Sequence, residues 1–255
     1  MNTDNSGLLS ALPEEMLPYA EGRRFVRESI GLSGDEVWMS ENAVLKIGTD
    51  IKNSLETVKM LRWLAGRLPV PEVIAHTVEG GKSFLLMTRI KGRMSCEKYF
   101  LEHPAELLER MAEGLWMFWD TDITGCPRIR DAEAELDDLR PRLEKGLIGD
   151  PALFRRLENS KPPCDPVLSH GDFCLPNVFI DGGHISGFVD LGDSGIADRY
   201  RDIALCWQSL KSNSDGTFGG KVYPDFDPDA LFSALGITPD REKLNYYLQL
   251  GELFG

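Results

Sequence analysis

Short apolar runs bounded by turn residues fill the first third of the chain. Such runs predict β-strands, because the glycine, asparagine and proline residues around them mark turns. One longer segment, residues 54–67, places apolar side chains at every third position, which predicts an amphipathic helix with Ser54 as a candidate N-cap. The strands are predicted at residues 24–26, 37–39, 43–47 and 83–87.

The remainder of the chain is mainly helical in pattern. Residues 104–119 form a strongly apolar segment that starts with proline, a residue favoured in the first turn of a helix. Residues 211–229 are rich in glycine, serine, aspartate and proline, which predicts a loop. Further helices are predicted within residues 131–158, from residue 197 onward and at residues 231–237. We therefore expect an α+β protein with a small part built on a mixed sheet and a larger, mostly helical part.

A predicted hairpin lies in the second part of the chain. Residues 177–181 predict a strand, a Gly-Gly pair supplies a two-residue turn, and residues 184–190 predict the returning strand. Because a hairpin returns the chain to its starting point, we expect Asp190 to lie beside Asn177. Asp172 lies just upstream of this hairpin, after a His-Gly pair.

Asp172, Asn177 and Asp190 are the residue types that kinase-type phosphoryl transfer requires. One carboxylate orients the attacking hydroxyl group and accepts its proton, while an amide and a second carboxylate hold the magnesium ions that bridge the nucleotide phosphates. A single aspartate at a turn is more often a solvated turn residue or a helix cap. All three residues in this order favour chemistry, with Asp172 as the catalytic residue and Asn177 and Asp190 as metal ligands.

Lys46 interrupts an apolar strand, where a lysine is costly to bury without a partner. It either points outward from an edge strand or holds the α- and β-phosphates of a nucleotide, and the downstream motif favours the nucleotide. Kinases pair this lysine with a glutamate on the next helix. Glu56 is the only acidic residue in the predicted helix, so we expect it to pair with Lys46 in the nucleotide site.

Composition narrows the class of protein. The chain has 255 residues and a formal net charge of −13, which disfavours nucleic acid and anionic membranes as partners and suits a cationic ligand. No apolar run approaches the ~18–20 residues of a membrane helix. The N-terminus lacks the pattern of a signal peptide, so we expect a cytoplasmic location. Five scattered cysteines without a CxxC pair argue against a disulfide framework and against a zinc site.

Three segments resemble a known family. HGDFCLPN at 170–177, GFVDLG at 187–192 and ADRYRDIAL at 197–205 resemble motifs of the aminoglycoside phosphotransferases, in particular of the 3′-phosphotransferase group of antibiotic kinases. The resemblance implies a bilobal protein-kinase-like fold, with an N-lobe at 1–90 and a C-lobe at 91–255. It also implies ATP, or GTP in its place, and Mg²⁺ as cofactors, with a cationic aminoglycoside as acceptor. We expect a monomer or a weak dimer.

The resemblance assigns roles to residues outside the hairpin. Ser33 would contact the ATP phosphates, and backbone groups near Arg89 and Ile90 would read the adenine edge. Near the C-terminus, Glu252 and Phe254 match a segment that closes the antibiotic pocket and binds the ammonium groups of the drug.

The chain also departs from the family pattern. Counted back from the RWLAGRLPVP segment at 62–71, the helix glutamate of the family aligns closer to Thr57 than to Glu56. Either the helix is shifted by one residue, or the pair between Lys46 and Glu56 is imperfect. Asp193 stands where relatives carry arginine, and we expect it to serve a cationic drug as an extra carboxylate. Gly255 displaces the terminal carboxylate by one residue. We expect Asp202 to brace the catalytic loop rather than to react.

Two other functions remain as alternatives. The first is a kinase of another small molecule, such as a different amine-bearing sugar or a macrolide, and the C-terminal Glu-Leu-Phe segment argues against it. The second is a nucleotide-binding protein that no longer transfers phosphate. The displaced helix glutamate and Asp193 favour this second alternative, whereas the intact Asp172, Asn177 and Asp190 argue against it.

Overall fold

The structure is a computed structural model that describes residues 5–28, 35–218 and 220–254. Two residues of the sequence predictions, Ser33 and Gly255, lie outside these ranges. Within them, no helix is long and apolar enough to cross a membrane.

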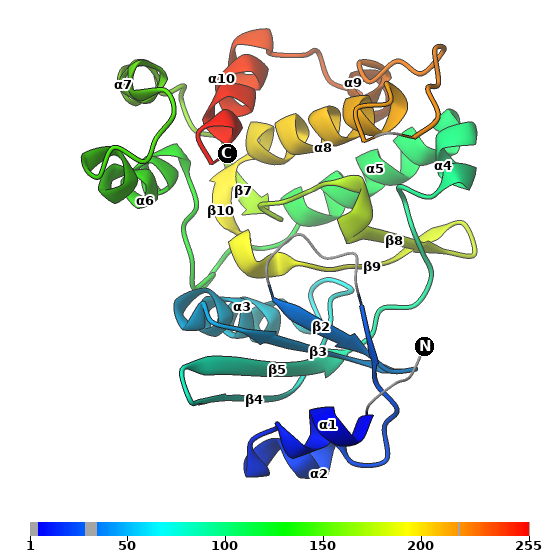
Figure 1. The fold of residues 1–255 in the computed structure, drawn as a ribbon. Coiled ribbons are helices and arrows are strands. Elements are labelled where there is room, and N and C mark those ends of the chain that lie inside the picture. Colours follow the sequence, from blue (N-terminus) through cyan, green and yellow to red (C-terminus); the bar gives the residue numbers. More distant parts are fainter. Residues whose placement is uncertain (1–4, 29–34, 219, 255) are drawn as a thin grey trace. The chain divides into compact units, whose positions relative to one another are not determined.

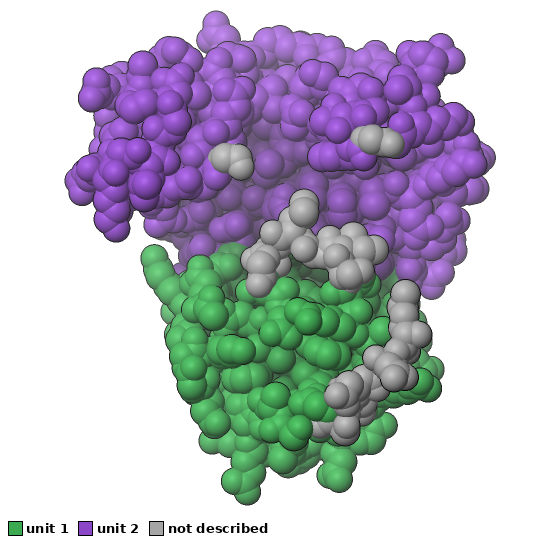
Figure 2. All heavy atoms as spheres, viewed as in Figure 1, with its two compact units in different colours: residues 1–91, 187–192 green, residues 92–186, 193–255 purple. Residues whose placement is uncertain are grey.

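The chain divides into two compact units, which Figure 2 distinguishes by colour. The smaller unit holds residues 1–91 and 187–192, and the larger unit holds residues 92–186 and 193–255. The sequence predicted a single crossing from one unit to the other near residue 90. The chain instead returns to the smaller unit for the short segment that contains Asp190.

The smaller unit is built on a five-stranded sheet with the strand order β1-β2-β3-β5-β4 (Figure 1). Its elements in chain order are α1 (Asn5–Ser10), the 3-10 helix η1 (Glu14–Met16), α2 (Leu17–Ala20), β1 (Val26–Arg27), β2 (Glu36–Met39), β3 (Ala43–Gly48), α3 (Ile51–Leu64), β4 (Val73–Glu79) and β5 (Lys82–Thr88).

Every pairing recorded in this sheet is antiparallel, so the prediction of a mixed sheet was wrong. The reason lies in the connections, because tight turns join β2 to β3 and β4 to β5, and a tight turn reverses the direction of the chain. Asp50, rather than Ser54, caps α3: its Oδ1 accepts a hydrogen bond from the Asn53 N–H at 3.0 Å. The predicted long helix beside the sheet is confirmed.

Alternate residues of β3 face opposite sides of the sheet. Ala43, Leu45 and Ile47 are buried in an apolar cluster with side chains from the N-terminal helices. Figure 1 shows α1 and α2 on one side of the sheet and α3 on the other. Lys46 therefore lies on the face opposite α1 and α2.

The larger unit combines stacked helices with two small sheets (Figure 1). Its elements are β6 (Arg93–Met94), α4 (Lys98–Glu102), α5 (Pro104–Trp119), α6 (Ala132–Glu144), α7 (Pro151–Asn159), β7 (Pro166–Ser169), η2 (Leu175–Asn177), β8 (Val178–Asp181), β9 (His184–Phe188, which ends in the smaller unit), η3 (Leu191–Asp193, which begins in the smaller unit), β10 (Gly195–Asp198), α8 (Arg199–Ser214), α9 (Ala230–Leu235) and α10 (Arg241–Glu252). The predicted helix at 104–119 is confirmed, whereas α8 continues into the segment predicted as a loop.

The start of α8 fixes three elements of the larger unit together. β10 pairs antiparallel with β7 and leads into α8, whose N-cap is the fully buried Asp198. The Asp198 carboxylate accepts hydrogen bonds from the Tyr200 N–H at 2.9 Å, the Asp165 N–H at 2.8 Å and the Lys243 Nζ at 2.6 Å. One side chain thus ties α8 to the chain before β7 and to α10.

Candidate active site

The hairpin expected from the Gly-Gly pair is present. β8 and β9 are neighbours in a three-stranded sheet of order β6-β8-β9. Gly182 and Gly183 join them with φ angles of 58° and 81°, which a two-residue hairpin turn favours and which glycine adopts readily. Asn177 belongs to the larger unit and Asp190 to the smaller one. Their expected proximity therefore stays a prediction.

Asp202 braces the loop that follows β7. This side chain is fully buried in the first turn of α8. Its Oδ1 accepts from the Ser169 Oγ at 2.9 Å and from the Gly171 N–H at 2.9 Å, while its Oδ2 accepts from the His170 N–H at 2.7 Å. Burial raises the pKa of Asp202, an effect that Arg201 and the three donors oppose. The structural role expected for Asp202 is confirmed.

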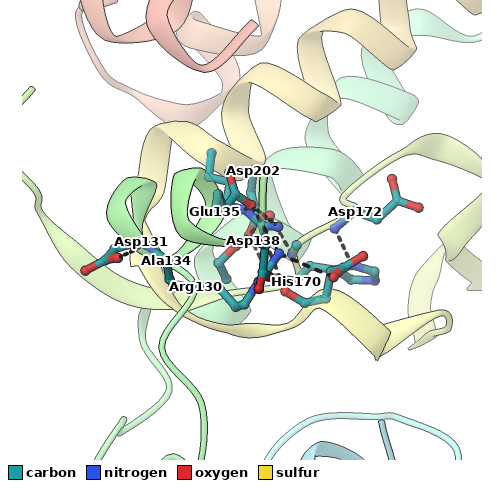
Figure 3. A network of polar contacts seen from close by, with 12 residues as sticks. Arg130, Asp131, Ala134, Glu135, Asp138, His170, Asp172 and Asp202 are labelled. Atoms are coloured by element: carbon teal, nitrogen blue, oxygen red, sulfur yellow. Dashed lines mark hydrogen bonds and ion pairs between the residues drawn. The ribbon is translucent and has the colours of Figure 1, made fainter. Parts of the chain in front are cut away.

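Gly171 and His170 fix the path of the backbone toward Asp172. Gly171 has a φ of 88°, and a side chain there would collide with the Asp193 carbonyl and the Arg201 guanidinium. The buried His170 ring packs against the rings of Phe118 and Phe173, with centroids 5.4 and 5.8 Å away. Its Nδ1 accepts a hydrogen bond from the Asp172 N–H at 3.2 Å, which Figure 3 shows.

Asp172 and Asn177 contact each other directly. The Asn177 Nδ2 donates to the Asp172 Oδ2 at 2.8 Å and to the Asp172 carbonyl at 3.0 Å. Because the NH₂ group of Asn177 makes these hydrogen bonds, its amide oxygen points away from Asp172. An amide oxygen is a ligand that Mg²⁺ accepts, so the arrangement suits the metal role expected for Asn177.

Two serines support this loop from behind, and sequence reasoning missed both. The Ser209 Oγ accepts from the Leu175 N–H at 3.0 Å, and the Ser95 Oγ donates to the Leu175 carbonyl at 2.7 Å. Both serines are buried. They lie far from Leu175 in the sequence, and no spacing rule predicts such contacts.

In the smaller unit, Lys46 pairs with Asp190. The Lys46 Nζ lies 2.9 Å from the Asp190 Oδ1, and the side chain of Lys46 is 26% exposed. Asp190 has a φ of 60°, a left-handed conformation that aspartate tolerates better than most residues do. Such strained positions are concentrated at functional sites. The alternative of a solvated lysine on an edge strand is wrong, because β3 lies between β2 and β5.

The segment around Asp190 is anchored to the smaller unit at both ends. On one side, the Phe188 N–H donates to the Pro69 carbonyl at 2.9 Å, and Gly187 lies so close to Ile90 that a side chain would clash with it. On the other side, Gly192 lies against Thr57 of α3. These contacts explain why the segment belongs to the smaller unit.

The expected pair between Lys46 and Glu56 is not formed in the described structure. Glu56 instead pairs with Lys59, with 2.6 Å between Oε1 and Nζ. Thr57 has no carboxylate, and its Oγ1 donates to the Asn53 carbonyl at 2.8 Å. The physical reason is spacing along α3, since residues three apart on a helix are neighbours on its surface.

Arg89 and Ile90 directly follow β5, near the point where the chain leaves the smaller unit. The Arg89 N–H donates to the Asn42 carbonyl at 3.0 Å, and its guanidinium donates to the Ser40 carbonyl at 3.0 Å. Arg89 thus secures the turn between β2 and β3, and its N–H is engaged. The predicted contact with adenine then depends on other backbone groups, and for Ile90 it stays a prediction.

Asp193 faces positive charge. Its Oδ1 lies 3.8 Å from the Arg128 Nη2 and 3.6 Å from the Arg130 Nη2, while its carbonyl accepts from the Arg201 Nη1 at 3.2 Å. The Asp193 side chain is 52% exposed, so these ion pairs are weak. Two arginines that share its charge weaken the interpretation of Asp193 as a carboxylate for a cationic drug.

A buried ionic network links α6 to Arg201 of α8 and to Arg130, and the sequence analysis did not predict it (Figure 3). Glu135 on α6 pairs with Arg201 at 2.5 Å and with Arg130 at 3.8 Å. Arg130 also contacts Asp138 at 2.5 Å. The positive charges of two buried arginines are thereby matched by carboxylates, as burial of charge requires.

The C-terminal candidates lie at the end of α10. Glu252 is the last residue of this helix and is exposed, and the Phe254 side chain is 41% exposed. The intervening Leu253 is buried and holds the segment in place. Both candidates are accessible to a ligand, and their contact with a drug stays a prediction.

Asn177 and Asp190 are each of a residue type that can bind a magnesium ion. Mg²⁺ is usually held by one or two protein oxygens together with substrate phosphates. Asn177 offers an amide oxygen, and Asp190 offers a carboxylate. Among the residues that the structure describes, no group of three or more His, Cys, Asp or Glu side chains could hold a metal ion. An amide oxygen and a carboxylate are each donors that suit a metal held together with a nucleotide.

A carboxylate at the end of a braced loop, in an α+β chain whose sheet carries a paired lysine, is what kinase-like phosphotransferases have in common. This is the class that the fold and the residues define. The model of the phosphotransferase enzyme family matches residues 30–240.

Curated relatives extend the match along nearly the whole chain. An aminoglycoside 3′-phosphotransferase of Niallia circulans is 34% identical in an alignment 264 positions long, which covers 95% of this chain and 97% of that protein. One of Enterococcus faecalis is 34% identical in an alignment 265 positions long, which covers 94% of this chain and 97% of that protein. The chain belongs to the phosphotransferase enzyme family, in its aminoglycoside 3′-phosphotransferase branch.

Solved structures agree on the fold. An aminoglycoside phosphotransferase of Streptomyces rimosus has a TM-score of 0.77 at 21% identity and covers 99% of both chains. An aminoglycoside-3′-phosphotransferase of type VIII has a TM-score of 0.79 at 23% identity, with 98% of this chain and 97% of that chain covered. The kinase-like α+β class expected from the sequence is confirmed.

Proposed function

We propose that this protein transfers the γ-phosphoryl group of ATP to the 3′-hydroxyl group of aminoglycosides of the kanamycin and neomycin type, and thereby confers resistance. The observation that carries the proposal is the braced loop, in which Asp202 holds the backbone of His170 and Gly171 while Asn177 contacts the Asp172 carboxylate. The names of the 34% identical relatives support the 3′ position.

The residues divide the work of phosphoryl transfer, which is mostly positioning and charge stabilisation. Asp172 orients the acceptor hydroxyl group and takes its proton. Lys46 holds the α- and β-phosphates. Asn177 and Asp190 hold Mg²⁺, which when bound neutralises charge that develops on the transferred group. ATP rather than another donor is supported by the Streptomyces rimosus enzyme, which was solved with ADP and streptomycin.

The acceptor is a polycation, and the chain is acidic, with a formal net charge of −13. We assign the ammonium groups of the drug to Glu252 and to the segment around Phe254, which are exposed at the end of α10. Asp193 is a poorer candidate, because Arg128 and Arg130 share its charge. The enzyme would act in the cytoplasm as a monomer or weak dimer, where ATP and Mg²⁺ are abundant.

The test measures ADP release with kanamycin, neomycin and the 3′-deoxy drug tobramycin. It compares the wild type with Asp172→Asn and with Asp181→Asn, a matched control because Asp181 is exposed at the end of β8. We expect turnover with the first two drugs only, and a loss of about 10²–10⁴-fold in kcat for Asp172→Asn, the usual contribution of a catalytic base. Asp181→Asn should behave as the wild type does.

The position of transfer is read from the product by ³¹P–¹H NMR. A phosphate on another hydroxyl group would refute 3′ transfer while leaving the kinase assignment intact. Absence of turnover with every drug, in protein that binds ATP and magnesium, would contradict the antibiotic-kinase proposal and favour another acceptor or a silent relative.

A further inference from the structure

Lys46 has an acidic neighbour that the sequence motifs do not explain. Asp35 stands directly before β2, which pairs antiparallel with β3 in the register Val37↔Lys46 and Glu36↔Ile47. Residues opposite one another in an antiparallel pair share a face, and faces alternate along each strand. Asp35 therefore lies opposite Gly48, on the face of the sheet that carries Lys46.

Gly48 provides the space that the Asp35 carboxylate occupies. A Cβ atom at residue 48 would overlap the Oδ1 and Cγ atoms of Asp35. Lys46 is the diagonal neighbour of Asp35 across the pair of strands. The backbones of diagonal neighbours are roughly 7–8 Å apart, a distance that long side chains can span. Burial raises the pKa of Asp35, Lys46 opposes this shift, and Asp190 and Asp50 add to it. The Asp35 carboxylate thus interacts with both members of the Lys46–Asp190 pair.

The helix beside the sheet offers Lys46 no such partner. Glu56, the only acidic residue of α3, is 2.6 Å from Lys59. The side chains of α3 that lie against Gly192 are Asn53 and Thr57, which are both neutral. Kinases in general supply the lysine with a carboxylate from this helix. In the part of this chain that the structure describes, the carboxylates near Lys46 come from Asp35 and Asp190.

The Asp190 carboxylate interacts with Lys46 and, under the proposed function, also with a magnesium ion. It pairs with Lys46 at 2.9 Å, and under the proposed function the same carboxylate binds magnesium. A carboxylate that binds a divalent cation attracts a neighbouring lysine much less. We propose that Asp35 is the positioning residue that holds Lys46 in place for the nucleotide phosphates when Asp190 is engaged with the metal. The inference rests on the nucleotide binding of the proposed function, but not on the identity of the acceptor.

The test is a titration of the full chain with fluorescent mant-ADP and Mg²⁺, with no acceptor present. It uses Asp35→Asn, Lys46→Ala, the double variant, and Glu36→Gln as a matched control. Glu36 is the next residue, faces the other side of the sheet and lies 3.7 Å from Arg27. We expect Asp35→Asn to raise Kd about tenfold, within the range of coupling between neighbouring residues, and to add nothing to Lys46→Ala. Glu36→Gln should leave Kd unchanged.

A second variant displaces the carboxylate without removing its charge. Gly48→Ala puts a methyl group where the Asp35 carboxylate lies, and Gly48 is not among the glycines with a positive φ, so its backbone accepts alanine. This variant should raise Kd as Asp35→Asn does, and Asp35→Glu should recover part of the loss. In turnover with ATP, Asp35→Asn should raise KM for ATP more than it lowers kcat.

A Kd that is unchanged or lower in Asp35→Asn would overturn the inference, because it would mean that the carboxylate is neutral or repels the phosphates. A full tenfold loss that persists in the Lys46→Ala background would also overturn it, because Asp35 would then act without Lys46. If the mant-ADP results are as expected and no aminoglycoside is phosphorylated, the proposed acceptor is wrong and the role of Asp35 stands. If the wild type binds no nucleotide, both proposals fail.

Discussion

Replacing Asp202 with asparagine changes one hydrogen bond out of three, which makes the brace of the catalytic loop measurable. Oδ1 of Asp202 accepts from Ser169 and Gly171, and Oδ2 accepts from His170 at 2.7 Å. Asparagine has a single oxygen, which can take the place of Oδ1. Its NH₂ group then faces the His170 N–H, so two donors meet in a buried site. Alanine removes all three acceptors.

The expected changes in the free energy of unfolding follow from the number of hydrogen bonds that each variant loses. A hydrogen bond to a charged acceptor contributes about 1.5–3 kcal/mol, so Asp202→Asn should lower the free energy of unfolding by about 2 kcal/mol. Asp202→Ala leaves three buried donors and the neighbouring Arg201 without this carboxylate, and breaking a buried charged group of this kind costs about 3–5 kcal/mol. Since native proteins are stable by only about 5–15 kcal/mol, the alanine variant should be marginal.

Urea unfolding followed by tryptophan fluorescence gives these energies, with the exposed Asp181→Asn as the control. Turnover is measured on the same samples. The brace holds the backbone that precedes Asp172, and a small displacement of a positioned group costs about 10²-fold in rate. We therefore expect kcat of Asp202→Asn to fall by about 10–100-fold at temperatures where the variant is folded.

Two outcomes would refute this reasoning. If Asp202→Asn matches the wild type in stability to within about 0.5 kcal/mol, the hydrogen bond from the His170 N–H does not help to hold the loop. If stability falls as expected but kcat does not change, the loop keeps Asp172 in place without the brace. In that case Asp202 is a folding residue of the core and has no role in positioning Asp172.

Two further predictions concern charge and pH. Asp193→Arg should lower the free energy of unfolding by about 1 kcal/mol, measured by thermal unfolding, because the new arginine would repel Arg128 and Arg130. Asp193→Asn should cost less. An arginine variant that is more stable than the wild type would contradict these ion pairs. Tyrosine ionises near pH 10, and burial raises the pKa of Tyr246 to about 12. The contribution of protonated Tyr246 to stability is therefore complete below pH 10 and is lost as the pH rises through 12. In this pH range the urea midpoint of Tyr246→Phe should fall less steeply than that of the wild type. Equal slopes of urea midpoint against pH in the two proteins would contradict this prediction.

Local patterns made the hairpin and the main helices predictable. The Gly-Gly turn between β8 and β9 is a short-range signal, and the apolar run of α5 gave both ends of the helix. The brace by Asp202 followed from a motif. By contrast, Glu135 and Arg201 are 66 residues apart in the sequence, and nothing in either neighbourhood indicates the partner. Contacts of this kind depend on how α6 packs, which periodicity does not specify.

The partner of Lys46 was mispredicted for a related reason. The sequence predicts a carboxylate on α3, because a kinase lysine requires one and Glu56 is the only acidic residue there. On the helix surface Glu56 is closer to Lys59, and residues three apart satisfy each other first. The sheet register, which places Asp35 opposite Gly48 and diagonally across from Lys46, becomes visible only once β2 and β3 are paired.

Two of the three expected departures from the family pattern, those at Thr57 and Asp193, have one feature in common, which bears on whether this chain is a silent relative. At Thr57, where the resemblance implies a glutamate, the chain has no carboxylate, but Asp35, directly before β2, interacts with Lys46. At Asp193, where the resemblance implies an arginine, the positive charge comes from Arg128 and Arg130. Electrostatic stabilisation depends on the charge at a place rather than on the element that supplies it. A departure at a single position is therefore weak evidence for lost activity when its charge is supplied by a neighbour.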